Sequence, residues 1–314
     1  MSRPQVAALR STDHKEPMVA QDLAVIILTF NSAAVIERTV AAALKVSSTI
    51  ICVDSGSTDG TRQILERLGC QVHERPFKHY ADQRNWAIEM LGNRYPWQLH
   101  LDADEILDVD AIAAVLQGVA DPRGHQGFLL LRRTYFLGHA LRYGGTASWH
   151  LRLFRSGCGL CEDRLYDQHF ICAGPAAKLR GLLHDMNIAS LTEWTARHNR
   201  WSDMEAAELL RPPAGDSSAR LQARLGGDPR ERRRAVRGAY YRAPRYLRAW
   251  AAFFVRYVLQ LGFLDGRAGF LYAFFQVLWF RMLIDAKLEI AGMTAASTQA
   301  PTVVTTQPPV RPTR

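Results

Sequence analysis

Short apolar runs alternate with amphipathic segments from residue 23 to about residue 120, and this alternation constrains the fold more than any other feature. The run 23–30, LAVIILTF, is continuously apolar, as is typical of a strand buried on both faces of a sheet. Further strands are predicted over 49–54 and 70–74 and in the run that ends at Asp102. The sequence therefore predicts an α/β fold, with a mostly parallel sheet flanked by helices.

Helices are expected between these strands because apolar residues recur there at helical spacing. They are predicted around residues 35–44, 64–68, 81–91 and 112–119. Candidate N-caps are Asn31 or Ser32 for the first helix and Asp108 or Asp110 for the last. Beyond residue 120, the sequence predicts an added β region, with strands at 128–131 and 149–154, and then a helix over 191–210.

Polar side chains follow three of the predicted strands. They are Phe30-Asn31, Asp54-Ser55 and Asp102-Ala103-Asp104. In sheets of this kind, ligands bind beyond the carboxyl ends of the strands, so we expect the three clusters to converge on one crevice. Residues i and i+2 of a strand point the same way, so Asp102 and Asp104 can share one target. Mg²⁺ prefers carboxylate oxygens together with substrate phosphates, which predicts a metal–diphosphate site.

The net charge of +9 is concentrated in one segment. Residues 211–248 hold eleven Arg and three acids, a net charge of +8. A basic block beside an apolar segment predicts binding to an anionic membrane surface. Nucleic-acid binding and a solvated face are the alternatives for this block.

Residues 246–284 are strongly apolar and divide at Gly262–Gly269. Each part is shorter than the roughly 20 apolar residues that span a bilayer. We favour paired helices lying in the membrane interface, with Arg256 and Arg281 reaching the headgroups. A true span and a core helix pair of a soluble protein remain open.

The sequence predicts disorder at both ends of the chain. Residues 1–21 are polar and contain no apolar segment of a secretory signal, so we expect the protein on the cytoplasmic side. The tail 294–314 is rich in Thr, Pro and Ala.

Five cysteines without framework spacing predict free thiols. The expected division is a domain over 22–210, an Arg-rich linker over 211–245 and membrane-associating helices over 246–293.

Four motifs together carry a family resemblance. They are LTFN at 28–31, VDSGSTDGT at 53–61, RN at 84–85 and LDAD at 101–104. Over residues 22–210 their order and spacing resemble inverting family-2 glycosyltransferases, which have the GT-A fold. RLFR at 152–155, Leu183-His184 and GFLDG at 262–266 are similar to the branch that includes lipopolysaccharide-core β-glucosyltransferases.

The resemblance implies roles for individual residues at the strand ends. Asp54 would accept hydrogen bonds from the uracil or ribose of a UDP-sugar, and Arg84 would face its diphosphate. Asp104 would hold Mg²⁺ or Mn²⁺, Asp102 would touch the ribose or the metal, and His184 is a third candidate ligand. The other residues expected to line the nucleotide-sugar site are Thr29, Asn31, Ser55 and Ala103.

Inversion at the anomeric carbon needs one general base for the acceptor hydroxyl. In related sequences a carboxylate follows a Val-His pair, and Tyr166-Asp167 occupies that place here. The resemblance therefore implies Asp167 as the base. Glu162 and Asp163 stay open as alternatives.

The resulting hypothesis is an enzyme at the cytoplasmic face of the inner membrane. It would move a hexose from a UDP-sugar to a lipid-linked or lipopolysaccharide-core acceptor. A sugar nucleotidyltransferase would need a Gly-rich, basic loop after the first strand, which residues 29–34 do not provide. A non-enzymatic nucleic-acid or membrane scaffold would have no use for acidic strand ends, so no nucleic-acid partner is expected.

Overall fold

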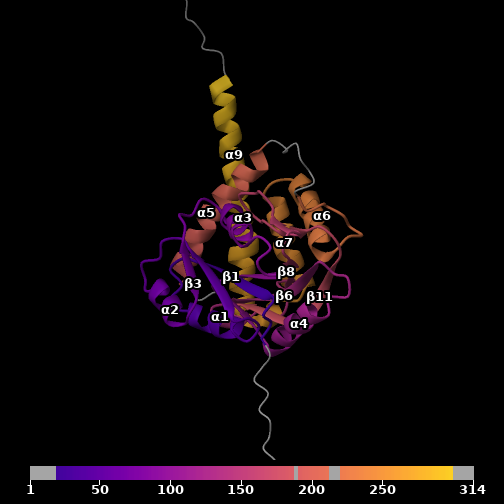
Figure 1. Ribbon diagram of the computed structural model, residues 1–314. Coiled ribbons are helices and arrows are strands. Elements are labelled where there is room, and N and C mark those ends of the chain that lie inside the picture. Colours follow the sequence, from indigo (N-terminus) through magenta and orange to yellow (C-terminus); the bar gives the residue numbers. More distant parts are fainter. Residues whose placement is uncertain (1–18, 187–189, 212–219, 300–314) are drawn as a thin grey trace, which may run out of the picture.

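The computed structural model describes residues 19–186, 190–211 and 220–299, and its centre is a nine-stranded sheet flanked by helices (Figure 1). The strand order is β3-β2-β1-β4-β8-β6-β11-β5, with β7 paired to β6. Strands β1 to β4 are mutually parallel, β8 is antiparallel to both of its neighbours, and β11 is parallel to β6. The predicted α/β class is confirmed, but the sheet is mixed and not mostly parallel, because parallel pairing of β1 to β4 is followed by antiparallel pairs on both sides of β8 and between β5 and β11.

The bounds of the strands agree closely with the apolar runs. The large sheet contains β1 (Leu23–Thr29), β2 (Thr49–Asp54), β3 (Gln71–Glu74), β4 (Trp97–Asp102), β5 (Glu105–Leu107), β6 (Gly127–Phe136), β7 (His139–Ala140), β8 (Ser148–Arg155) and β11 (Ala176–Asp185). A separate two-stranded sheet pairs β9 (Gly159–Cys161) with β10 (Phe170–Cys172).

The helices of the first half lie where helical spacing predicts them. They are α1 (Ile36–Ala43), α2 (Thr61–Arg67), α3 (Tyr80–Leu91) and α4 (Val109–Ala120), followed later by α5 (Leu191–Leu210). Asp108 caps α4, accepting from the Ala111 amide at 2.7 Å. The prediction that Asn31 or Ser32 caps α1 is wrong, because α1 begins after Val35 without a side-chain cap.

The central strand β1 is buried on both faces, which explains its continuous apolar sequence. Leu23, Val25 and Ile27 pack on the side of α1 and α4. Ala24 and Ile26 pack on the other side, against α3. Helices on both faces thus leave only the ends of the strands open to a ligand.

The Arg-rich segment is a packed helix over part of its length, not only a linker. Helix α6 (Pro229–Arg242) starts at a capping box made by Asp228 and Glu231. Arg230 is buried and donates to the Phe170 carbonyl at 2.6 Å. Residues 212–219, near the start of the predicted linker, lie outside the described residues.

The C-terminal apolar region forms a helical hairpin. It contains α7 (Leu247–Phe254), the π-helix η1 (Val255–Leu259), the 3₁₀ helix η2 (Gly262–Asp265), α8 (Gly266–Tyr272), the π-helix η3 (Ala273–Trp279) and α9 (Phe280–Gln299). Gly262–Met293 is the one described helical stretch whose length and composition would suffice to cross a membrane, and 44% of its most apolar window is buried within the protein.

Helix α9 packs along α5 and then projects from the body of the molecule (Figure 1). Because it continues to Gln299, the prediction of disorder from residue 294 is wrong for residues 294–299. The predicted disorder of residues 1–18 and 300–314 falls outside the described residues. The five cysteines are free thiols, as expected.

Candidate active site

The carboxyl ends of β1, β2 and β4 lie side by side at one edge of the sheet. The last residues of β1 align Thr29 with Asp54 on β2, and Leu28 with Asp102 on β4. Two strand spacings place Asp54 and Asp102 about 10 Å apart across β1. The strand-end clusters therefore meet at one edge of the molecule, as the alternation of strands and helices predicts.

Asp54 organises the loop that follows β2. Its side chain is fully buried and accepts from the Thr29 hydroxyl at 2.8 Å, the Ser57 hydroxyl at 2.6 Å, and the amides of Gly56 and Ser57 at 3.1 and 2.8 Å. Four bonds fill the acceptor capacity of a carboxylate. In this conformation Asp54 and buried Thr29 therefore fix the loop that follows β2.

Asn31 joins the β1 end to the same loop. The backbone amide of Asn31 donates to the Ser57 hydroxyl at 2.9 Å. The side-chain oxygen of Asn31 accepts from the Thr58 backbone amide at 2.9 Å. Asn31 adopts a φ of 45°, a region that Asn tolerates better than most residues. Ser55, at the end of β2, accepts from the Gln83 side chain on α3 at 3.1 Å. These hydrogen bonds join the residues that follow β1 and β2 to each other and to α3.

Asp102 lies between two buried guanidinium groups. Arg84 on α3 donates to one carboxylate oxygen, and Arg152 on β8 donates to the other at 2.7 Å. Arg152 also reaches Glu105 at 2.5 Å, while the second oxygen of Glu105 accepts from the Asp102 amide at 3.0 Å. Burial alone would raise the pKa of Asp102, but Arg152 and Arg84 hold it well below its usual range. Asp102 is thus a fixed, ionised carboxylate.

Arg84 is more enclosed than its predicted role requires. Its side chain is 4% exposed and is engaged by Asp102 and by the Leu101 carbonyl at 2.9 Å. One terminal nitrogen of Arg84 is buried without a hydrogen-bond partner among the described residues. A direct contact with a diphosphate would therefore use that nitrogen or require Asp102 to turn away.

Asp104 sits in the turn between β4 and β5, where several acids converge. Burial, and then the charges of Asp185, Asp102 and Glu105, raise its pKa to about 7, against an opposing effect of Arg197. Mutual repulsion of this kind is relieved by a bound cation, and oxygen ligands suit Mg²⁺ or Mn²⁺. No cluster of three or more His, Cys, Asp or Glu in the described residues is arranged as a complete metal site. Asp102 and Asp104 fit a site that also takes ligands from a substrate.

His184 points away from these acids. Neighbouring strand residues face opposite sides, and Asp185 is the β11 residue that interacts with Asp104 and, at 3.6 Å, with Arg132. His184 instead contacts Tyr135 at 3.1 Å and Asp108 at 4.0 Å. The structure therefore does not favour His184 as the third ligand, and Asp185 is the β11 residue whose charge acts on Asp104.

The three candidate general bases lie in different surroundings. Glu162 is fully buried and accepts from the amides of His169 and Leu221 and from Arg234, so it cannot reach an acceptor. Asp163 is 69% exposed, with Arg211 at 3.6 Å. It lines an open cavity of about 310 Å³ beside α3, together with residues such as Arg75 and Trp86.

Asp167 is held by the Arg-rich helix. Arg237 donates to its carboxylate, Arg234 donates to its carbonyl at 3.2 Å, and His169 lies 3.7 Å from it. Against the effect of burial, Arg237 and His169 hold the pKa of Asp167 well below its usual range. Asp167 is ionised but weakly basic in this arrangement, which corrects the simple picture of a free catalytic carboxylate.

Sequence reasoning assigned no site role to three charged residues that the structure brings to the site: Arg132, Arg152 and Asp185. Arg132 and Arg152 interrupt the apolar strands β6 and β8. A charged residue inside a buried strand signals an internal ion pair, since an unpaired buried charge is costly. Asp185 had a weaker signal, as the polar end of a strand.

Comparison with protein families identifies one domain. The model of "Glycosyl transferase family 2" matches residues 24–177, which contain β1 to β10 and all three strand-end clusters. The match thus includes Asp54, Asp102, Asp104 and Asp167.

Curated relatives match part of the chain. An uncharacterized glycosyltransferase of Rickettsia bellii is 37% identical over 29% of this chain and 30% of its own length. A lipopolysaccharide core biosynthesis glycosyltransferase of Rhizobium meliloti is 28% identical over 51% of this chain and 62% of its own. The chain therefore spans less than two thirds of these relatives.

Solved structures give partial superpositions. Glucosyl-3-phosphoglycerate synthase of Mycobacterium tuberculosis aligns over 37% of this chain and 43% of that protein, with 19% identity and a TM-score of 0.28. Residues 1–349 of TarS from S. aureus align over 86% of this chain and 91% of that protein, with 11% identity and a TM-score of 0.38. At these TM-scores, neither comparison bears on the site.

Proposed function

Since residues 24–177 of this chain belong to glycosyl transferase family 2, we propose that the protein is an inverting glycosyltransferase. It moves a hexose from a UDP-sugar to a saccharide or lipid acceptor at a membrane, in the synthesis of lipopolysaccharide or another cell-envelope polysaccharide. One observation carries the proposal: the Asp54 loop and the Asp102–Asp104 turn lie at one edge of the sheet, on either side of β1. The lipopolysaccharide-core relative supports the cell-envelope setting.

The donor lies across the strand ends in this proposal. The loop fixed by Asp54 and Asn31 presents backbone groups to the nucleoside, and Ser55 borders the same surface. Ala103 and Asp104 form the turn on the other side. Arg84 and Arg152 hold the Asp102 carboxylate in one orientation. In addition to contacting the metal, Asp102 therefore fixes the turn before the donor binds.

Asp104 and Asp102 would hold Mg²⁺ or Mn²⁺. A bound divalent cation supplies positive charge where the departing diphosphate gains negative charge. Burial and the negative charges of Asp185, Asp102 and Glu105 raise the pKa of Asp104, and a bound cation would offset this concentration of negative charge.

Asp167 remains our proposal for the general base. For this role its bond to Arg237 must open when the acceptor binds, because a carboxylate between guanidinium groups takes up a proton poorly. Arg237 also bonds to both oxygens of Glu205. It therefore retains a partner when Asp167 turns toward the acceptor hydroxyl.

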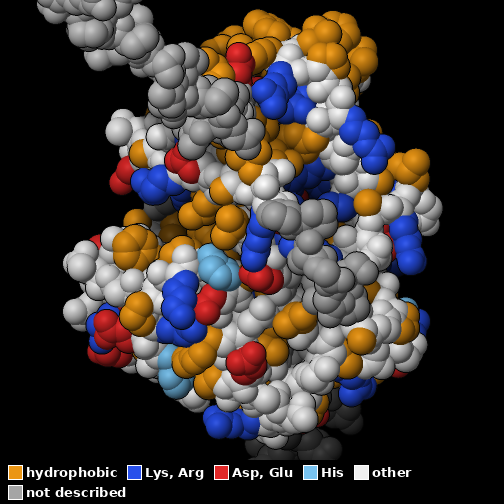
Figure 2. All heavy atoms as spheres, turned by 90° about the horizontal axis from the view of Figure 1, so that it is seen from above, with side chains coloured by type: hydrophobic (Ala, Val, Ile, Leu, Met, Phe, Trp, Pro, Cys, Tyr) orange, Lys and Arg blue, Asp and Glu red, His pale blue; other side chains and the backbone are white. Residues whose placement is uncertain are grey.

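The helical hairpin is our proposed membrane contact. Its exposed apolar residues include Leu247, Trp250, Phe254, Leu259 and Leu264, each more than half exposed. A broad apolar area is visible from above the molecule (Figure 2). Such an area suits a helix that lies in the interface.

The Arg-rich block contributes less to membrane binding than its sequence suggests. Six of its residues form ion pairs with acids of the protein: Arg211, Arg220, Arg230, Arg234, Arg237 and Arg248. These charges stabilise the fold, so we assign membrane docking mainly to the apolar hairpin.

Turnover of UDP-sugars with and without Mn²⁺ tests the proposed function. Asp104→Ala should lower turnover about a hundredfold, as expected for the loss of a group that stabilises transition-state charge. Asp110→Ala, an exposed acid in the first turn of α4, is the control. The proposal fails if the wild-type protein turns over no UDP-sugar and Asp104→Ala leaves Mn²⁺-dependent UDP binding unchanged.

A further inference from the structure

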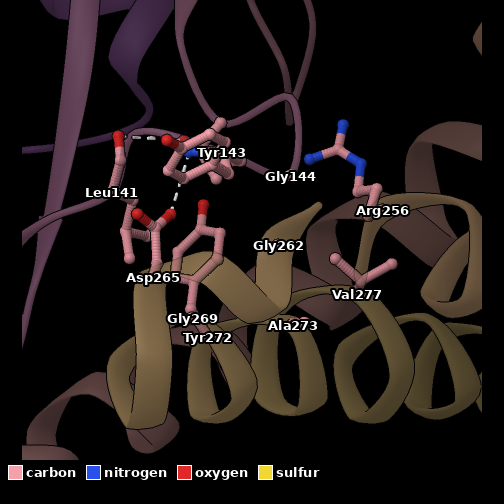
Figure 3. A pocket seen from close by; sticks show the side chains of 11 residues that line it. Leu141, Tyr143, Gly144, Arg256, Gly262, Asp265, Gly269, Tyr272, Ala273 and Val277 are labelled. Atoms are coloured by element: carbon pink, nitrogen blue, oxygen red, sulfur yellow. Dashed lines mark hydrogen bonds between the residues drawn. The ribbon is translucent and has the colours of Figure 1, made fainter. Parts of the chain in front are cut away.

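The loop between β7 and β8 lies against the helical hairpin. Asp265 on η2 accepts from the backbone amides of Arg142 and Tyr143 at 3.0 and 2.9 Å (Figure 3). The Gly144 amide donates to the Gln260 carbonyl at 2.8 Å. These bonds join two segments that are more than 100 positions apart in the sequence, the Arg142–Asp265 separation being 123.

The junction of the two segments, residues 141–147 and 260–267, is closely packed. Leu141 belongs to one buried cluster with Ala268 of the hairpin. The cavity between the loop and the hairpin measures only about 10 Å³, room for one water. The loop and the hairpin therefore present one continuous surface.

Apolar side chains are exposed on both segments of this junction. Each is at least 40% exposed, and they are Tyr143 on the loop and Leu261, Phe263 and Leu264 on the hairpin. They extend the apolar area of the hairpin onto the sheet domain. An exposed apolar area shared by two distant segments indicates an interaction surface.

The junction also carries positive charge that the protein does not neutralise. Arg142 and Arg267 are exposed, and across the described residues neither guanidinium forms an ion pair. Residues 246–284 contain a single acid, Asp265, whose oxygens accept from the two loop amides, and residues 137–147 contain none. An anionic partner would therefore complement this surface.

The sheet topology places the junction at the same edge as the donor site. Strand β8 is antiparallel to both β4 and β6, so β4 and β6 run in the same direction. Leu99 on β4 and Phe128 on β6 both pair with Leu153, which puts them at one level of the sheet. From there β6 continues to Phe136, about 15 Å beyond the level of Asp102. The loop that follows therefore lies beyond the strand ends.

We propose that the junction binds the anionic surface of a membrane, with Tyr143 and Leu264 among the lipids and Arg142 and Arg267 at the phosphate headgroups. This inference rests on the membrane docking under Proposed function and adds the sheet domain to the contact. Aromatic and aliphatic side chains beside arginines suit the membrane interface. The contact turns the donor edge toward the bilayer that holds a lipid-linked acceptor. A second copy of this chain fits poorly, because a symmetric contact would bring the same unpaired cations together.

Sedimentation of the full chain with vesicles tests the proposal, using phosphatidylcholine alone and an equimolar mixture with phosphatidylglycerol. Combined Arg142→Gln and Arg267→Gln should weaken binding to the anionic vesicles by about fivefold per arginine. Combined Arg94→Gln and Arg123→Gln is the matched control, since these exposed arginines precede β4 and β6 at the opposite edge of the sheet. Tyr143→Ser should weaken binding to both kinds of vesicle by about fivefold or more. Thermal melting of each variant separates a lost contact from lost folding.

Equal binding by the charge variant and its control overturns the proposal, as does unchanged binding by Tyr143→Ser. If only Trp250→Ser with Phe254→Ser weakens binding, the hairpin docks without the sheet domain, and this inference alone is refuted. UDP affinity in the presence of Mn²⁺ is measured separately, and its absence refutes the proposed donor site instead. Light scattering covers the remaining occupant: a dimer that Tyr143→Ser dissociates overturns the membrane assignment.

Discussion

Replacement of Arg152 by Met is the most informative perturbation of the site. The Arg152 side chain is 9% exposed and joins Asp102 at 2.7 Å to Glu105 at 2.5 Å. Glu105 is 1% exposed, so removal of Arg152 leaves a carboxylate in the protein interior without its main counter-charge. Arg84 continues to pair with Asp102, which places most of the loss at Glu105.

The size of the effect follows from the number and kind of bonds lost. Each hydrogen bond to a charged group contributes about 1.5–3 kcal/mol, and breaking a buried pair costs about 3–5 kcal/mol. We expect Arg152→Met to lower the free energy of unfolding by about 3–5 kcal/mol, a large part of the stability of an ordinary domain. Addition of Glu105→Gln should restore at least about half of the loss, because no unpaired charge then remains.

Urea unfolding at constant pH in EDTA measures these differences. Arg123→Met is the control, because Arg123 and Asp121 form an exposed pair whose loss should cost less than about 1 kcal/mol. The reasoning is refuted if Arg152→Met costs no more than the control, or if Glu105→Gln worsens the defect instead of relieving it.

Three further predictions concern catalysis, pH and membrane binding. Asp167→Asn should lower the rate of sugar transfer by about 10²–10⁴-fold and leave UDP affinity unchanged. The control, Asp163→Asn at an exposed carboxylate, should change neither quantity. Loss of UDP affinity in Asp167→Asn would contradict the role of Asp167 as the base. Burial lowers the pKa of His198 to about 4, so the unfolded chain takes up a proton that the folded chain does not, and stability is lost as pH falls from about 6.5 toward 4. Urea unfolding should therefore show about 2 kcal/mol less stability at pH 5 than at pH 7 from this group, and His198→Gln should remove that part of the slope. Trp250→Ser combined with Phe254→Ser should weaken sedimentation with vesicles about tenfold or more, whereas Leu225→Ser, exposed outside the hairpin, should not; equal sedimentation of both variants would refute docking by the hairpin.

Local sequence was sufficient for the framework of this protein. A continuous apolar strand such as 23–29 has few alternatives to a buried place in a parallel sheet, and helical spacing between strands leaves little choice for their connections. The parallel order then brings Asp54 and Asp102 to one edge without any information on distant contacts. These features depend on residues a few positions apart, which the sequence displays directly.

Charge pairing between distant residues was decided only by the tertiary structure. The Arg-rich block reads as a membrane-binding surface, yet Arg234 and Arg237 turn inward to Glu162 and Asp167, about 70 positions away. Likewise, one position on β11 separates His184 from Asp185, and strand alternation sends the two to opposite faces. Burial makes each ion pair strong, but burial is a property of the assembled fold, so no local pattern identifies which acid meets which base.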